Sequence, residues 1–299
     1  MRGHLLAANR LLLLSILVTS TLVAGRVHAS VDEDADTSFI QHNLGASDPH
    51  AFDEFGSSVA IYGNFAVVGA PYHDVWDGLA NQSSAGAAYV YERTNNTWSF
   101  VQKLESSIPQ QDANFGISVG IGSGVIAVGA VGYDSATEND VGAVYIFTHN
   151  DDQWEVKQIL ESGADEAGEG FGSTLDLAGK VMIIGAPYSD INGTEDAGAA
   201  YIFIGSSGSW FQQDALTASA QEKDATYGYS VSTDGTHVLV GSPSEGNYGG
   251  AYLYEKGSLN WTLSAYLNPG DGREGDFFGA AVSIDGDRAA VGASLKDPH

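Results

Sequence analysis

An internal repeat with nearly constant spacing constrains the fold of this chain more than any other feature. An aromatic residue followed by glycine occurs five times, and a Gly-Ala or Gly-Ser pair follows each copy after 14 residues. In four copies a Gly-x-x-Tyr segment comes next, with a tryptophan 12 residues after its glycine. The aromatic-glycine pairs are Phe55-Gly56, Phe115-Gly116, Phe171-Gly172, Tyr227-Gly228 and Phe278-Gly279. Such self-similarity indicates a chain built from copies of one structural unit.

Only one interval changes from copy to copy. The distance from the Gly-Ala glycine to the Gly-x-x-Tyr glycine is 17, 13, 13 and 8 residues, whereas 17 residues always separate the tryptophan from the next aromatic. Length variation is therefore confined to one connection in each repeat. Binding residues tend to lie in loops that vary on a fixed scaffold, so this connection is the first place to look for a site.

Each unit is expected to form four short strands and no helix. In the first copy these are residues 56–61, 65–69, 87–91 and 98–104, and Gly63-Asn64 is a tight hairpin signal between the first two. Residues 65–69 form a continuous apolar run, which fits a strand buried on both faces. Four-stranded units of about 56 residues, with glycine where backbones crowd, are typical of β-propeller blades.

The motif resembles a known repeat family. Phe-Gly followed after 14 residues by Gly-Ala-Pro, most complete at Gly69-Ala70-Pro71 and Gly185-Ala186-Pro187, is similar to the FG-GAP repeat. The resemblance runs from about residue 39 to residue 293. It implies an all-β fold, a β-propeller like the N-terminal propeller of integrin α-subunits, which has seven blades. It also implies extracellular adhesion or ligand binding as the common role.

We therefore expect residues 38–299 to form about four and a half blades of a seven-bladed propeller. The fifth copy reaches His299 before its third strand, and residues 38–44 match the fourth-strand pattern of residues 98–104. That strand would lack a neighbour if five blades closed on themselves, and an open edge invites aggregation. We expect the full protein to continue for about two blades. The alternative is a partner chain that donates the missing strand.

The N-terminus has the pattern of a secretory leader. Arg2, His4 and Arg10 precede the apolar run 11–24, and Val27-His28-Ala29 fits a cleavage signal. The run is short for a membrane span of about 20 residues, and no second apolar stretch follows. We predict a signal peptide over residues 1–29, an acidic segment over 30–37, and a secreted protein, held at the cell surface if a further C-terminal part carries an anchor. Four N-glycosylation sequons fit this route: Asn81, Asn95, Asn192 and Asn260.

Composition excludes several other classes of protein. There is no cysteine, so disulfide frameworks and thiolate metal sites are excluded. The chain carries 12 Lys and Arg against 38 Asp and Glu, a formal charge of −26, and cleavage after Ala29 removes three arginines, leaving 9 against 38, or −29. Phosphate would be repelled, so no nucleic-acid partner is expected.

Acidic and amide side chains recur in the variable loops. In the second and third copies they stand at alternate positions: Asp134, Glu138 and Asp140, then Asp190, Asn192 and Asp196. Oxygen ligands in this pattern suit Ca²⁺, but aspartates also cap the turns of such loops, and both interpretations are open. The calcium loops of integrins lie elsewhere, between Phe-Gly and Gly-Ala-Pro, so those sites cannot be transferred to this chain.

The longest variable loop holds His73 and Trp76, which have no counterparts in other copies. Tyr72, His73, Trp76 and Asp77 are the predicted ligand-binding residues, although Trp76 could instead fold back on its own loop. The expected ligand is an extracellular protein or carbohydrate. The repeated tyrosines and tryptophans, in contrast, are expected to pack.

A non-catalytic binding protein is therefore the leading interpretation. The alternative is an extracellular propeller enzyme acting on polysaccharide, or the accessory domain of a larger enzyme. It would gain support if His73, Lys103 and Arg93 met loop acids on one face. Ser118 fits a nucleophile-elbow pattern but lies at a strand position repeated in other copies, so it is expected to be architectural. Three histidines lack metal or triad spacing: His50, His149 and His237.

Overall fold

The computed structural model describes residues 41–122, 124–150, 153–164, 166–206 and 209–295. All the secondary-structure elements in these ranges are β-strands, which confirms the all-β expectation. The predicted signal peptide, residues 1–29, and the acidic segment, residues 30–37, lie outside the described residues. In the part of the chain that is described, no helix could cross a membrane.

Four repeats each form a four-stranded antiparallel sheet. The first sheet has the order β1-β2-β5-β6, and the next three follow the chain order in the same way. Its strands are β1 (Val59–Tyr62), β2 (Phe65–Ala70), β5 (Ala87–Thr94) and β6 (Thr97–Leu104). The second sheet contains β7 (Phe115–Gly122), β8 (Val125–Ala130), β9 (Ala143–Asn150) and β10 (Gln153–Leu160). Strands therefore form where the repeat pattern predicts them.

The later repeats continue the series. The third sheet contains β11 (Thr174–Ala178), β12 (Val181–Ala186), β13 (Ala199–Ser206) and β14 (Ser209–Leu216). The fourth contains β15 (Ser230–Thr233), β16 (His237–Ser242), β17 (Gly250–Lys256) and β18 (Trp261–Leu267). The fifth repeat is a hairpin of β19 (Phe278–Asp285) and β20 (Arg288–Ala293).

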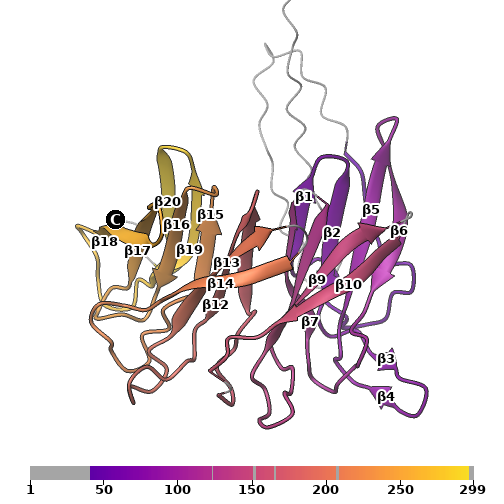
Figure 1. The fold of residues 1–299 in the computed structure, drawn as a ribbon, viewed down its shortest axis with the longest axis horizontal. Helices are drawn as coiled ribbons and strands as arrows, with labels where there is room; N and C mark the ends of the chain where they lie inside the picture. Colours follow the sequence, from indigo (N-terminus) through magenta and orange to yellow (C-terminus); the bar gives the residue numbers. More distant parts are fainter. Residues whose placement is uncertain (1–40, 123, 151–152, 165, 207–208, 296–299) are drawn as a thin grey trace, which may run out of the picture.

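Neighbouring blades pack side by side in sequence order. β7 contacts β1, β2 and β11, and β15 contacts β11, β12 and β19 (Figure 1). Hydrophobic clusters fill the spaces between successive sheets; one of them joins Val67 and Val90 of the first blade to Val128 and Phe147 of the second. The strands β1 and β20 belong to the two terminal repeats of the series and are largely exposed. This arrangement is that of consecutive propeller blades.

Repeated hydrogen bonds connect the inner parts of neighbouring blades. The hydroxyls of Ser58, Ser118 and Ser230 each donate a hydrogen bond of 2.7 Å to a glycine carbonyl oxygen in the next blade. The acceptor for Ser118 is Gly172. Ser118 is thus an architectural residue, as its recurrence predicts.

The outer strands of the blades are also joined. Gln102 donates to the backbone carbonyl of Trp154 and accepts from its N–H, at 2.9 and 2.8 Å, and Gln158 makes the same pair with Trp210. The repeated tryptophans and the Gly-x-x-Tyr tyrosines are buried. The expectation that these aromatic residues pack is confirmed.

The structure departs from the sequence-based expectation at two places near the first blade. Its long variable loop contains a small hairpin, β3 (Val75–Trp76) and β4 (Asn81–Gln82), which the pattern did not reveal. Residues 41–44, the described part of the expected strand 38–44, form no strand. This segment instead packs on the first blade, because Leu44 contacts its core and Tyr91 donates a 2.7 Å hydrogen bond to the Gly45 carbonyl.

Candidate functional site

The candidate site lies at the first blade, between the segment before β1 and the loop from β2 to β5. A pocket of about 560 Å³ is lined by residues from both segments, among them Phe52, Glu54, Tyr72 and Asp74. The variable loop of the first repeat therefore meets the segment that precedes β1 at this pocket. Carboxylates and aromatic rings together line this pocket.

The structure places the four predicted ligand-binding residues in different settings. Tyr72 lines the pocket, and Trp76, on β3, is 66% exposed. Asp77 closes the β3–β4 hairpin, because it accepts hydrogen bonds from the backbone N–H groups of Leu79 and Ala80 at 2.7 Å. His73 is only 2% exposed and lies beneath the surface. Of the two outcomes that the sequence left open for Trp76, the exposed position is the one observed.

Phe52 is a pocket residue that the sequence did not reveal. It is 91% exposed and adopts the left-handed backbone conformation, with φ at 74°. This conformation costs a non-glycine residue about 1–2 kcal/mol. The same position, three before the repeat aromatic, is left-handed in the other copies too, but there it holds residues that tolerate it: Asp112, Gly168, Asp224 and Gly275. Phe52 therefore combines an unfavourable backbone conformation with an unfavourable exposure of its aromatic ring to water. A residue with such local strain is a candidate for a functional role.

His73 belongs to a charged cluster beneath the pocket. Its Nδ1 lies 2.9 Å from Asp53 Oδ2, and its Nε2 lies 3.5 Å from Lys103 Nζ. Because the ammonium can only donate, Nε2 faces it as the acceptor and Nδ1 carries the proton donated to Asp53. Lys103 also binds Asp48 at 2.8 Å and Glu105 at 2.6 Å. One positive charge therefore stands among three carboxylates.

The protonation states in this cluster follow from its contacts. Burial opposes the charged form of Asp48, but hydrogen bonds from Lys103 and Tyr89 outweigh it and lower the pKa of the carboxyl. Burial also opposes the charged form of Lys103, yet hydrogen bonds to Asp48 and Glu105 raise its pKa. Burial, with the hydrogen bond to Asp48, raises the pKa of Tyr89. The cluster is ionic at neutral pH, with a neutral phenol.

The loop acids have well-defined structural roles. The carboxylates of Asp134 and Asp190 accept the backbone N–H of Asp140 and Asp196, each at 2.9 Å, and Asp74 accepts that of Ser84 at 3.0 Å. These bonds close the loops in the way that turn-capping aspartates do. The other two predicted metal ligands, Glu138 and Asn192, are exposed. Calcium at these loops stays a prediction.

The four sequon asparagines, Asn81, Asn95, Asn192 and Asn260, are all exposed. Asn81 lines the pocket and its Nδ2 donates to Asp74 at 3.0 Å. A glycan on Asn81 would stand at the edge of the pocket. Use of these sequons stays a prediction.

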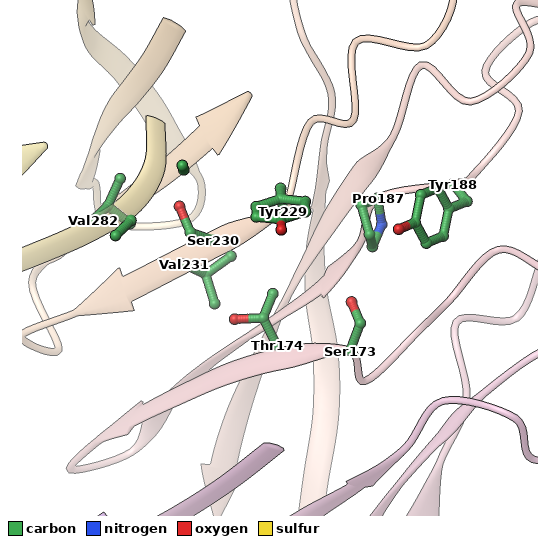
Figure 2. Close-up of a pocket in the computed structure, with 10 residues that line it drawn as sticks. Ser173, Thr174, Pro187, Tyr188, Tyr229, Ser230, Val231 and Val282 are labelled. Carbon is green, nitrogen blue, oxygen red and sulfur yellow. The ribbon is translucent and has the colours of Figure 1, made fainter. Parts of the chain in front are cut away.

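A second hollow lies among the inner strands of later blades. It has a volume of about 480 Å³ and collects residues from β11, β15 and β19. Figure 2 shows Tyr229 between Ser230 and Pro187, with Tyr188 beyond Pro187. Ser230 in its wall already donates to Gly279, so part of the lining is architectural. Sequence reasoning gave no signal for this hollow, because its residues come from three separate repeats.

The position of His73 holds a buried acid in the fourth blade. Glu245 Oε1 accepts the hydroxyl of Tyr252 at 2.5 Å, whereas Oε2 is buried without a hydrogen-bond partner. Burial raises the pKa of Glu245 in spite of the hydrogen bond from Tyr252. An acid whose pKa is raised by folding stabilises the protein below its unfolded pKa and loses that contribution as pH rises through the folded pKa.

Glu245→Gln should therefore stabilise the protein at pH 8 by about 1 kcal/mol, or about 2–4 °C in Tm, with no gain at pH 4. The amide keeps an acceptor for Tyr252 without placing a charge in the interior. Thermal unfolding at the two pH values measures the difference. The exposed Asp287 provides the control, Asp287→Asn, which should change neither Tm by more than the error; equal gains for Glu245→Gln at both pH values would contradict the assignment.

The repeats match a known family along most of the chain. Five segments match the model of the FG-GAP repeat: residues 40–91, 98–147, 154–203, 210–254 and 261–299. Over 223 residues the chain is 26% identical to integrin alpha-3 from Cricetulus griseus, which covers 69% of this chain and 20% of the length of that protein. From the second on, each matched segment begins in the fourth strand of one blade and continues into the next blade, so the repeat unit is offset by one strand from the blade. The chain therefore belongs to the FG-GAP repeat family, and its blades resemble those of the N-terminal propeller of integrin α-subunits.

Proposed function

We propose that this chain is a secreted or cell-surface, non-catalytic propeller that binds an extracellular protein or carbohydrate through the face of its first blade. The observation that carries the proposal is Phe52, an almost fully exposed aromatic residue in a backbone conformation that its counterparts satisfy with Asp or Gly. The similarity to integrin alpha-3 supports an extracellular, ligand-binding role. Exposed apolar groups that cost stability are a mark of interaction surfaces.

The chemistry of this face indicates what it would recognise. Phe52, Tyr72 and Trp76 are exposed aromatic side chains, and Leu79 at the hairpin tip is 90% exposed. Glu54 and Asp74 contribute carboxylates to the pocket between them. Aromatic faces stack on sugar rings and on the side chains of protein ligands, while carboxylates accept hydroxyl or cationic groups.

Phe52→Gly tests this proposal because it should separate stability from binding. Glycine adopts the left-handed conformation freely, so the variant should be as stable as the wild type or up to about 1 kcal/mol more stable. Its binding to the strongest ligand found on an immobilised panel of matrix proteins and glycans should fall by about tenfold or more, as for loss of an aromatic contact. Surface plasmon resonance and thermal unfolding give the two measurements.

The matched control is Phe211→Ala, since Phe211 is 63% exposed on β14 of the third blade, away from the pocket. It should leave binding unchanged. If Phe52→Gly binds as the wild type does, the first-blade face is not the binding surface. Calcium assistance, the finer part of the proposal, requires that Ca²⁺ added to dialysed protein strengthens binding and that Asp190→Asn removes this effect.

The alternative function is that of a polysaccharide-acting enzyme. Its support is the cluster in which His73 and Lys103 meet the acids Asp48 and Asp53. Arg93 does not join them: its guanidinium lies over the ring of Trp98, 5.9 Å from the centroid. His73 is buried and Lys103 is engaged by two carboxylates. These contacts favour binding over catalysis, and release of reducing sugar from a polysaccharide panel would reverse that preference.

A further inference from the structure

In other blades, the residue at the position of His50 makes a side-chain hydrogen bond to the variable loop, and His50 does not make this bond. In the second, third and fourth copies this position, five before the repeat aromatic, holds Gln110, Glu166 and Glu222. Their side chains accept a backbone N–H from the variable loop, that of Asp134, Asp190 or Gly246, at 2.8 to 3.0 Å. In the first copy an imidazole stands there, and it faces the interior acid Asp53. The first blade therefore lacks the hydrogen bond from the variable loop to this side chain. In its place, the imidazole of His50 brings a metal-ligating group to the pocket.

Three potential ligands converge at this point. His50, Asp53 and His73 offer one ligand atom each, and these atoms lie within 4.8 Å of one another. Asp53 Oδ2 is 2.9 Å from His73 Nδ1 and 3.9 Å from His50 Nδ1. The ligand atoms of a tetrahedral zinc ion with bonds of about 2.0–2.2 Å lie about 3.3–3.6 Å apart. The His50 side chain is 70% exposed, so rotation of this one imidazole can complete the geometry.

The two inner ligands are already held in place. Asp53 is fixed because its Oδ2 accepts the backbone N–H of His50 at 2.9 Å, a bond that recurs in the fifth copy between Arg273 and Asp276. His73 is buried, and its far nitrogen Nε2 lies 3.5 Å from Lys103 Nζ and 3.7 Å from Asp48 Oδ2. A metal-ligating histidine donates its far N–H to a group such as a carboxylate, and Asp48 is the acceptor that can orient this ring when a metal ion occupies Nδ1.

The electrostatic setting also favours a cation. Asp48, Asp53 and Glu105 outnumber the single charge of Lys103, and Glu54 and Asp74 line the pocket above. A metal ion at His73 Nδ1 displaces the proton there, and the ring stays a neutral imidazole because its proton moves to Nε2, which faces Asp48 Oδ2 at 3.7 Å. The excess of carboxylates then compensates the charge of the ion.

We propose that His50, Asp53 and His73 bind one divalent transition metal ion of the zinc type, with a coordination position open to the pocket. Two imidazoles and one carboxylate are ligands that suit Zn²⁺ and its neighbours rather than Ca²⁺ or Mg²⁺, which prefer all-oxygen sets. An open position lets the ion contact a carboxylate, amide or hydroxyl group of a bound ligand. His50 and Asp53 line the same pocket as Phe52 and Tyr72, so the metal ion and the aromatic groups would share one binding face.

The test is calorimetric titration of the dialysed protein with ZnCl₂, supported by the visible spectrum with Co²⁺. We expect one Zn²⁺ per chain and the d–d bands of a four-coordinate nitrogen and oxygen site. His50→Ala should weaken Zn²⁺ binding by more than about 100-fold, beyond the about 10- to 100-fold expected for loss of an outer-shell partner. Because His50 is exposed, this variant should unfold at the wild-type temperature.

His237→Ala is the matched control. His237 Nδ1 lies 2.8 Å from Asp234 Oδ2, an Asp–His pair like that of His73, but no second histidine or acid completes a group of three there among the described residues. Its loss should leave Zn²⁺ affinity unchanged. Failure of the wild type to bind Zn²⁺, absence of the Co²⁺ bands, or equal affinity of His50→Ala and wild type would each overturn the proposal and leave Asp53 and His73 as a purely structural pair.

Discussion

Gly185→Ala is expected to destabilise the protein by about 3 kcal/mol or more, the upper end of the range for overpacking. A Cβ at this position would lie 2.1 Å from the carbonyl oxygen of Gly228, in the next blade, and 2.5 Å from Thr174 Cγ2. The nearer contact is with backbone, which cannot move aside as the end of a flexible side chain can. Relief would therefore require two packed blades to separate.

Urea denaturation followed by tryptophan fluorescence measures this loss as a lower unfolding midpoint. Gly270→Ala is the control, since a Cβ there meets no atom within 4 Å, and its midpoint should match that of the wild type. If the two variants unfold at the same urea concentration, the blades do not approach each other as closely as the structure describes.

The same contact explains why the intervals along the sequence are so constant. A Cβ added at the equivalent glycines of the other blades, Gly69, Gly129 and Gly241, would lie about as close to the carbonyl oxygen of the aromatic-glycine pair in the following blade. Within a blade, the N–H of Gly172 donates to the carbonyl of Gly185, and the first and fourth blades repeat this bond. A one-residue insertion would break both contacts. The fold was therefore predictable from spacing alone, because backbone contacts fix the spacing.

The candidate site was predictable only in part. The variable loop identified Tyr72 and Trp76, since a local insertion is visible in a sequence. The cluster of His50, Asp53 and His73 was not visible, because its members lie on two connections whose meeting depends on the fold. Phe52 could have been found by comparing its position with Asp112 and Gly168, residues that mark a left-handed backbone. The β3–β4 hairpin is too short to produce a strand pattern of its own.

The aromatic residue of the repeat should contribute most to the free energy of unfolding in a blade that has neighbouring blades on both sides. Phe171 has no exposed surface, and its ring meets those of Tyr201 and Phe203 edge-on, with centroids 5.4 and 6.2 Å away. Phe55 makes similar contacts with Tyr89 and Tyr91 but is only half-buried, because no described blade precedes it.

Phe171→Ala is thus expected to cost about 3–5 kcal/mol, the range for removing a fully buried aromatic side chain, and Phe55→Ala clearly less. The two variants remove the same side chain from the same motif position, so each controls for the other. Urea midpoints of the pair give the comparison, with the solvent exposure of the ring as the main difference between the sites. Equal losses would mean that the first blade is covered in solution as fully as the third, by a further part of the protein or by a partner.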